Sequence, residues 1–254
     1  MVGAACKKAP DPAGPSPLKV QARKYESILP GCGDKEKREE PCVTFRVTWP
    51  EVVESKSSNV TMKINAAIMA RLQAKDAPRG FAAEAAAVAE DYHRFRKEFP
   101  HSAITYFTRR TAEVLHSTGT VFSVEIDEEE FRGGAHPNSH REYLNVRPET
   151  GEEIDLASVL NPGAEAKLLS IAEAHFRADK QMEEGAKYSD AGFHFADEKF
   201  SLSRTWGIAP QGLVFHYNDY EIASYATGPT TLVLPWREIG ALIRKDAGLM
   251  PAGK

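Results

Sequence analysis

Residues 104–146, ITYFTRRTAEVLHSTGTVFSVEIDEEEFRGGAHPNSHREYLNV, decide the fold class of this 254-residue chain. Gly119 separates a first predicted strand from a second at residues 120–126, and Gly133-Gly134 begins the turn toward a third at residues 142–146. Apolar runs rich in β-branched and aromatic residues, separated by glycine, are typical of strands that pair with their neighbours in sequence. The segment therefore predicts a three-stranded meander.

The residues before the meander predict two strands and two helices. Apolar and polar residues alternate over residues 43–49, as in a strand with one buried face, and Pro50 is expected to end that strand. Apolar residues recur at helical spacing over residues 60–72 and again over 81–99, which predicts two helices that pack on a sheet. Residues 20–29 are predicted to form the other strand.

The residues after the meander predict a further group of helices and strands. Strands that occur in groups between helices, without regular alternation, favour an α+β fold with a mostly antiparallel sheet and helices packed on it. We expect two subdomains that share one core, residues 18–125 and 126–245, between an N-terminal segment (1–17) and a tail (246–254). The predicted elements are a helix around residues 168–176, strands at 199–206, 212–217 and 230–234, and a short helix at 236–244.

The N-terminus predicts a lipid-anchored protein outside the cytosol. Small residues precede Cys6 as in a bacterial lipobox, so Cys6 is the candidate lipidation site. Four prolines within residues 10–17 favour an extended spacer after it. A chance match at an ordinary N-terminus is the alternative. With no apolar run long enough to span a bilayer, the anchor would be the only membrane contact of a periplasmic or other extracytoplasmic protein at the outer or inner membrane.

Cys32 and Cys42 flank a charged stretch with turn-forming residues at both ends. A disulfide that closes this loop fits an oxidising compartment. Zinc binding is the rival, but two thiols without nearby histidines make a poor zinc site. We therefore favour the disulfide.

Charge excludes one class of partner and suggests another. The net charge is -4 and no cluster of lysine and arginine compensates for it, so nucleic acid is not an expected partner. The acidic run at residues 127–130 is interpreted as a solvated turn, and it could also attract a cationic protein.

Two stretches carry a family resemblance. The first combines GGAHPN (133–138), YLNV (143–146) and TGEEIDL (150–156), and the second is GLVFHYNDYEIA (212–223) with LVLPW (232–236) after it. They resemble the extracellular domain family shared by the lysozyme-sensing anti-sigma factor RsiV and the N-terminal region of the peptidoglycan deacetylase PdaC. Cys32, Cys42 and the strand before Pro50 are similar to the N-terminal subdomain of related bacterial lipoproteins.

The resemblance, which covers about residues 18 to 245, implies a non-catalytic envelope module without a cofactor, because the deacetylase chemistry of PdaC belongs to a separate domain. It implies that the partner is a secreted or periplasmic, muramidase-like protein, which the module binds as an inhibitor, a sensor or an immunity protein. A peptidoglycan- or glycan-binding accessory protein of wall maintenance is the alternative. An unrecognised hydrolase has less support, since the chain has no Gly-x-Ser-x-Gly nucleophile motif.

The candidate partner-binding residues lie in the two distinctive stretches. Residues 218–225 mix aromatic and acidic side chains in a predicted loop, a composition suited to the centre of an interface. The glycine-rich stretch predicts a structured loop whose polar side chains either tie it together or contact a partner. His136 and His140 are four residues apart, but in a loop and without a third ligand they predict no metal site. The candidates are Asp219, Tyr220, Glu221, Tyr225, His136 and Asn138.

We expect Cys32 and Cys42 to be bridged in protein taken from the periplasm without reduction. Intact-mass measurement should then show the loss of both thiol hydrogens. Two free thiols in such material would contradict the pairing and the oxidising location together.

Overall fold

The computed structural model describes residue 14, residues 16–29 and residues 43–249. Cys6, Cys32 and Cys42 lie outside the described residues, so the lipidation site and the disulfide stay predictions. Within the described part, no helix is both long and apolar enough to cross a membrane.

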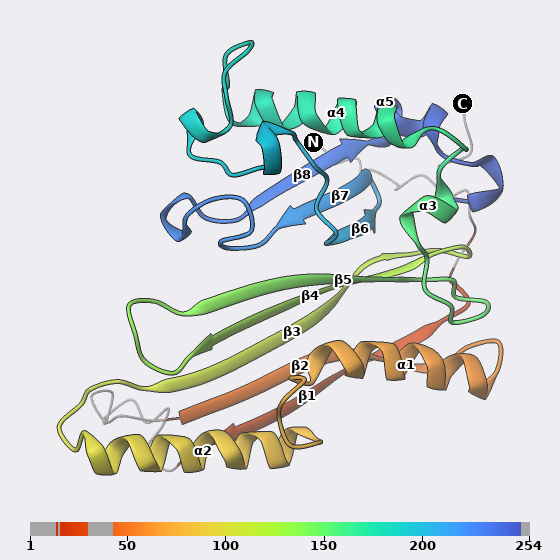
Figure 1. Cartoon of the computed structure of the whole chain (residues 1–254). Coiled ribbons are helices and arrows are strands. Elements are labelled where there is room, and N and C mark those ends of the chain that lie inside the picture. Colours follow the sequence, from red (N-terminus) through yellow and green to blue (C-terminus); the bar gives the residue numbers. More distant parts are fainter. Residues whose placement is uncertain (1–13, 15, 30–42, 250–254) are drawn as a thin grey trace, which may run out of the picture.

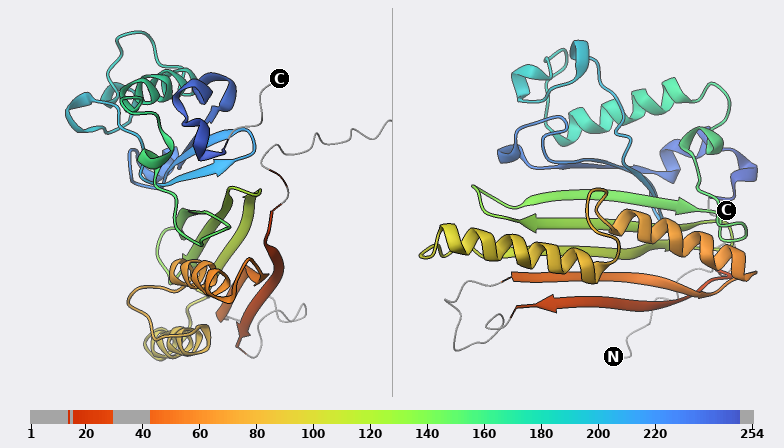
Figure 2. Two further views of the ribbon diagram at one scale, coloured as in Figure 1. Left: turned by 90° about the vertical axis from the view of Figure 1, so that its right-hand side faces the viewer. Right: turned by 60° about the horizontal axis from the view of Figure 1, so that its bottom comes forward.

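The N-terminal half is a five-stranded sheet in the order β1-β2-β3-β4-β5, with two helices across one face (Figures 1 and 2). The strands pair antiparallel except β2 and β3, which are parallel because the two helices carry the chain back between them. The elements are β1 (Lys19–Ile28), β2 (Val43–Glu54), α1 (Ser58–Leu72), α2 (Phe81–Glu98), β3 (Tyr106–Ser117), β4 (Phe122–Phe131) and β5 (Asn138–Val146).

The C-terminal half places a three-stranded antiparallel sheet, β6-β7-β8, over the β4–β5 side of the first sheet (Figure 1). Helix α4 covers its outer face. The elements are α3 (Leu156–Val159), α4 (Glu165–Asp179), β6 (Trp206–Ala209), β7 (Gly212–Tyr217), β8 (Thr230–Pro235) and α5 (Trp236–Ile239).

The two halves together confirm the predicted α+β class and the mostly antiparallel pairing. Strands β3, β4 and β5 confirm the predicted three-stranded meander.

Two local predictions were wrong. Strand β2 continues through Pro50 to Glu54, because β3 pairs with it only as far as Thr48 and no neighbour on that side needs the missing N–H. The strand predicted at residues 199–206 is irregular chain, and pairing begins only at Trp206.

The predicted single core is in fact two cores. One cluster of buried apolar side chains lies between α1, α2 and the five-stranded sheet, and the other lies between α4 and the three-stranded sheet. A small third cluster of Tyr143, Ala209 and Val214 joins them. Because β4 and β5 belong wholly to the first sheet, the predicted boundary at residues 125/126 falls inside β4 and does not separate the halves.

The two sheets are joined by the side chain of Asn145, which is 6% exposed on β5. Its Oδ1 accepts hydrogen bonds from the Ser123 hydroxyl at 2.7 Å and the Ile208 N–H at 2.9 Å, and its Nδ2 donates to the Trp206 carbonyl at 3.0 Å. One amide thus meets the donor and the acceptor of β6 as a neighbouring strand would. Without these bonds the facing polar groups would be buried unpaired.

We expect Asn145→Ala to lower the free energy of unfolding by on the order of 3 kcal/mol, because it orphans the Ile208 N–H and the Trp206 carbonyl. Chemical denaturation measures the change. Asn138→Ala, at the exposed start of the same strand, is the matched control and should change little. Equal losses in both variants would contradict the role of Asn145.

Candidate functional site

The two distinctive sequence stretches meet at one surface. The loop before β5 brings His136 against two tyrosines from the loop between β7 and β8. The imidazole of His136 stacks on the Tyr225 ring, with centroids 3.5 Å apart and planes within 10°, and its Nε2 lies 3.0 Å from the Tyr220 hydroxyl. We call His136, Tyr220 and Tyr225 the loop cluster. It joins residues far apart in sequence, one from a loop of the five-stranded sheet and two from a loop of the three-stranded sheet.

Tyr220 is the unusual member of the loop cluster. Its φ is +63°, in the left-handed region where a bulky side chain is an outlier, and 63% of its surface is exposed. Backbone strain of this kind costs about 1–3 kcal/mol and persists only where the surroundings enforce it. Since the exposed ring contributes little to a core, the strain marks Tyr220 as a candidate for contact with a partner.

Polar contacts from both halves hold this turn in place. The Asn218 side chain accepts a hydrogen bond from the Arg141 N–H at 2.6 Å and donates one to the Arg141 carbonyl at 3.1 Å. It thus pairs with β5 as the backbone of a neighbouring strand would. The hydroxyl of Ser139 donates to Asp219. Glu221 accepts from the Asn218 N–H at 2.9 Å and from Ser203 at 3.0 Å.

The six candidate residues therefore differ in placement. His136, Tyr220 and Tyr225 form the loop cluster, whereas the carboxylates of Asp219 and Glu221 are engaged within the chain. Asn138 is exposed at the start of β5, opposite Glu130.

The acidic run was wrongly expected to be a solvated turn. Residues 127–130 lie within β4, and each carboxylate pairs with an arginine that the sequence pattern did not connect to it. Little of their charge is left to steer a cationic partner. The pairs are Asp127–Arg141 (2.7 Å), Glu128–Arg110 (2.8 Å), Glu129–Arg109 (2.6 Å) and Glu130–Arg132 (3.4 Å).

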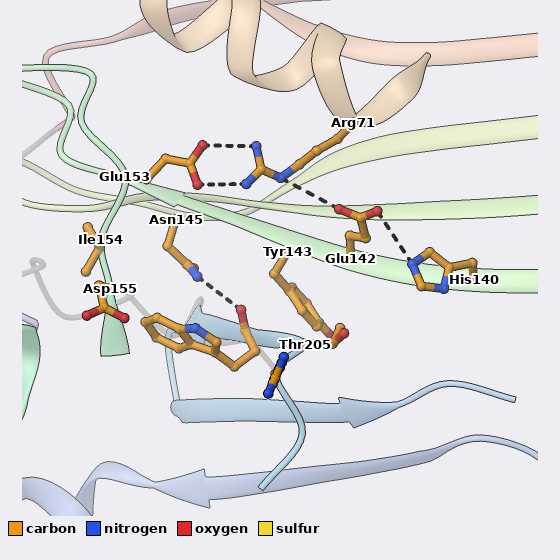
Figure 3. Close-up of a pocket in the computed structure, with 11 residues that line it drawn as sticks. Arg71, His140, Glu142, Tyr143, Asn145, Glu153, Ile154, Asp155 and Thr205 are labelled. Atoms are coloured by element: carbon orange, nitrogen blue, oxygen red, sulfur yellow. Dashed lines mark hydrogen bonds and ion pairs between the residues drawn. The ribbon is translucent and has the colours of Figure 1, made fainter. Parts of the chain in front are cut away.

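A polar cavity of about 450 Å³, the seam pocket, opens between α1, β5 and the chain leading into β6 (Figure 3). One wall is a chain of charges: Arg71 binds Glu153 at 2.7 Å and lies 3.8 Å from Glu142, which lies 3.5 Å from His140. The contact with Glu142 raises the pKa of His140, and the same contact lowers the pKa of Glu142.

Sequence analysis did not identify the seam pocket, because its walls come from four separate segments. Only Tyr143, Asn145 and the residues around Asp155 fell within the distinctive stretches, and nothing in the pattern linked them to Arg71 or Arg204. Among the described residues, no group of three or more histidine, cysteine or acidic side chains could hold a metal ion.

Two family models match successive parts of the chain. Residues 36–139 match deacetylase PdaC, and residues 157–237 match DUF3298, a protein family of unknown function. The chain is thus similar to PdaC over part of its N-terminal half and to DUF3298 over part of its C-terminal half. The predicted family resemblance is thus confirmed, and the loop cluster takes His136 from the PdaC-type region and both tyrosines from the DUF3298 region.

Two crystal structures share the fold. One is a DUF3298 family protein of Bacteroides fragilis, 16% identical with a TM-score of 0.72, and the other is from Pseudomonas aeruginosa, 17% identical with a TM-score of 0.66. Each match covers 93% of this chain and 98% of the other. No curated protein matches the chain.

His216, in the DUF3298 region, is a buried histidine on β7. It is 6% exposed, and its Nδ1 lies 2.8 Å from the Thr231 hydroxyl. Burial, and then the nearby Arg141 charge, lower its pKa to about 4, while Asp127 and Asp219 act in the opposite direction and His140 adds to the lowering. The imidazole is therefore neutral in the folded protein at neutral pH.

We expect His216 to make the fold acid-sensitive. Between its pKa in the unfolded chain, about 6.5, and its pKa in the folded chain, about 4, the His216 imidazole is protonated in the unfolded chain only. The free energy of unfolding therefore falls as the pH drops through this range, by on the order of 2–3 kcal/mol at the low end. Denaturant titrations across this range test the effect.

His216→Gln should lose less stability over this range than the unaltered protein does. His93→Gln, at an exposed position on α2, is the matched control and should keep the full acid sensitivity. Identical pH profiles for the two variants would contradict the assignment to His216.

Proposed function

We propose that this chain is a non-catalytic binding module of the bacterial envelope that recognises a lysozyme-like, peptidoglycan-cleaving enzyme as inhibitor, sensor or immunity protein. The module would be held at the membrane through lipidated Cys6. The observation that carries the proposal is the exposed, strained Tyr220 within a cluster built from both halves of the fold.

Two properties of the loop cluster suit a protein contact. Aromatic side chains bury a large area at low entropic cost and are frequent at the energetic centre of interfaces. The stack of His136 on Tyr225 and the hydrogen bond to Tyr220 fix the rings before a partner arrives, which reduces the ordering cost of binding. Asp219 and Glu221 contribute to this fixation through their bonds to Ser139, Asn218 and Ser203.

The loop cluster also gives the proposal a sharp test. Glycine adopts positive φ without strain, so Tyr220→Gly removes the ring while it favours the same turn. We expect this variant to bind a basic muramidase at least about 30-fold more weakly, equivalent to about 2 kcal/mol, while its unfolding free energy stays unchanged or rises by up to about 1 kcal/mol. Titration calorimetry and chemical denaturation measure the two quantities.

The matched control is Phe99→Ala, which removes another half-exposed aromatic ring at the end of α2, on the other half of the molecule. It should bind as the unaltered protein does. A Tyr220→Gly variant with full affinity would remove the loop cluster from the contact. If the unaltered protein bound no muramidase but were retained on purified peptidoglycan, the proposal would fail in favour of a glycan-binding accessory protein.

A further inference from the structure

The edge of β5 away from β4 is open inside the seam pocket. Strand β5 is the last strand of the five-stranded sheet, so nothing in the ladder pairs with that edge. Asn218 occupies it at Arg141, and the Ile154 N–H donates to the Asn145 carbonyl at 2.8 Å. Between these two closures stands Tyr143.

Tyr143 turns its backbone N–H and carbonyl toward this pocket. In an antiparallel pair the outward-facing residues alternate along the strand, and Arg141 and Asn145, two residues to either side, both use outward groups. The backbone N–H and carbonyl of Tyr143, which lies opposite Glu125 in the ladder, therefore also point outward. No hydrogen bond to a described residue occupies these two groups.

Two charges at the pocket wall also lack ion-pair partners within the described residues: Asp155, just before α3, and Arg204, before β6. Both side chains are exposed. The other charged groups of the wall are already matched in the chain from Glu153 to His140. The pocket thus offers one anion, one cation and one backbone donor–acceptor pair to a ligand.

We infer that the seam pocket binds a short extended peptide that carries a basic and an acidic side chain. The peptide adds one strand residue to β5 through the backbone of Tyr143, while its basic group meets Asp155 and its acidic group meets Arg204. Strand addition to an open sheet edge is a common mode of peptide recognition. A cavity of about 450 Å³ lies within the size range of small-ligand sites.

A saccharide fits these groups less well. Sugar rings favour an exposed aromatic face, but the Tyr143 ring packs on Gly207, where even an added Cβ would lie 2.5 Å from it, and Trp206 is only partly exposed and packs on the C-terminal core. The site is separate from the loop cluster and does not depend on muramidase binding.

The probes are two capped pentapeptides, Ala-Lys-Ala-Glu-Ala and Ala-Glu-Ala-Lys-Ala, which present the charges in either order because the direction of the bound strand is open. We expect at least one to bind and to shift the amide resonance of Tyr143. Methylation of its central backbone nitrogens, which removes donors, should weaken binding at least about ten-fold.

A double variant and a control variant test the side-chain contacts. The double variant Asp155→Asn/Arg204→Gln should bind the peptide at least about ten-fold more weakly. The control is Arg237→Gln, at a side chain that is 81% exposed and away from the pocket, and it should bind as the unaltered protein does. Tyr220→Gly should also bind the peptide normally, which separates this site from the proposed muramidase contact.

Failure of both peptides to bind would overturn the inference. So would binding of chitotetraose without either peptide, since that result would assign the pocket to glycans. Equal affinity for the methylated and unmethylated peptides would show that the β5 edge is not used and would overturn it as well.

Discussion

Asparagine amides complete the edges of the strands in this fold, and the arrangement of its two halves depends on them. Asn145 reaches from β5 to the N–H and carbonyl groups of β6, and Asn218 reaches from the end of β7 to those of Arg141 on β5. Asn65 of α1 does the same for Val52, where β2 extends past its partner β3. A primary amide can do this because it carries the donor and acceptor of a peptide group on a short arm. At these positions the strand edges are thereby closed without continuing the sheet.

This mode of joining explains why the buried apolar residues form two cores. The sheet surfaces that face one another carry polar side chains such as Ser123, Arg141 and His216. The two sheets meet through the hydrogen bonds of the Asn145 and Asn218 amides and only a small apolar contact. Each sheet must then bury its apolar face against its own helices. A polar seam between two apolar layers also leaves room for a cavity, because side chains that must satisfy hydrogen bonds cannot also fill all the space.

The sequence was informative wherever the cause of structure is local. Alternation over residues 43–49, helical spacing in α1 and α2 and glycines in the meander predicted those elements, since each reflects one buried face. The strand expected at residues 199–206 failed because Phe200 and Leu202 pack on the C-terminal core without belonging to a paired strand. The acidic run was misread because three of its four arginine partners, Arg109, Arg110 and Arg141, lie on neighbouring strands, where no local pattern reveals them. Both loops of the loop cluster were selected from their composition, but their contact required the tertiary fold.

The loop cluster and the seam pocket share a dependence on β5. Asn218, which positions Tyr220, holds the edge of β5 at Arg141, and the open groups of Tyr143 lie two residues farther along the same edge. The strand therefore serves as the common frame for a surface that faces a protein and a cavity that faces a smaller ligand. Because the strain at Tyr220 is sustained by contacts from both sheets, any movement of one sheet against the other would release it. The polar seam thus keeps the aromatic surface in its binding geometry, although it adds little apolar burial to the stability of the fold.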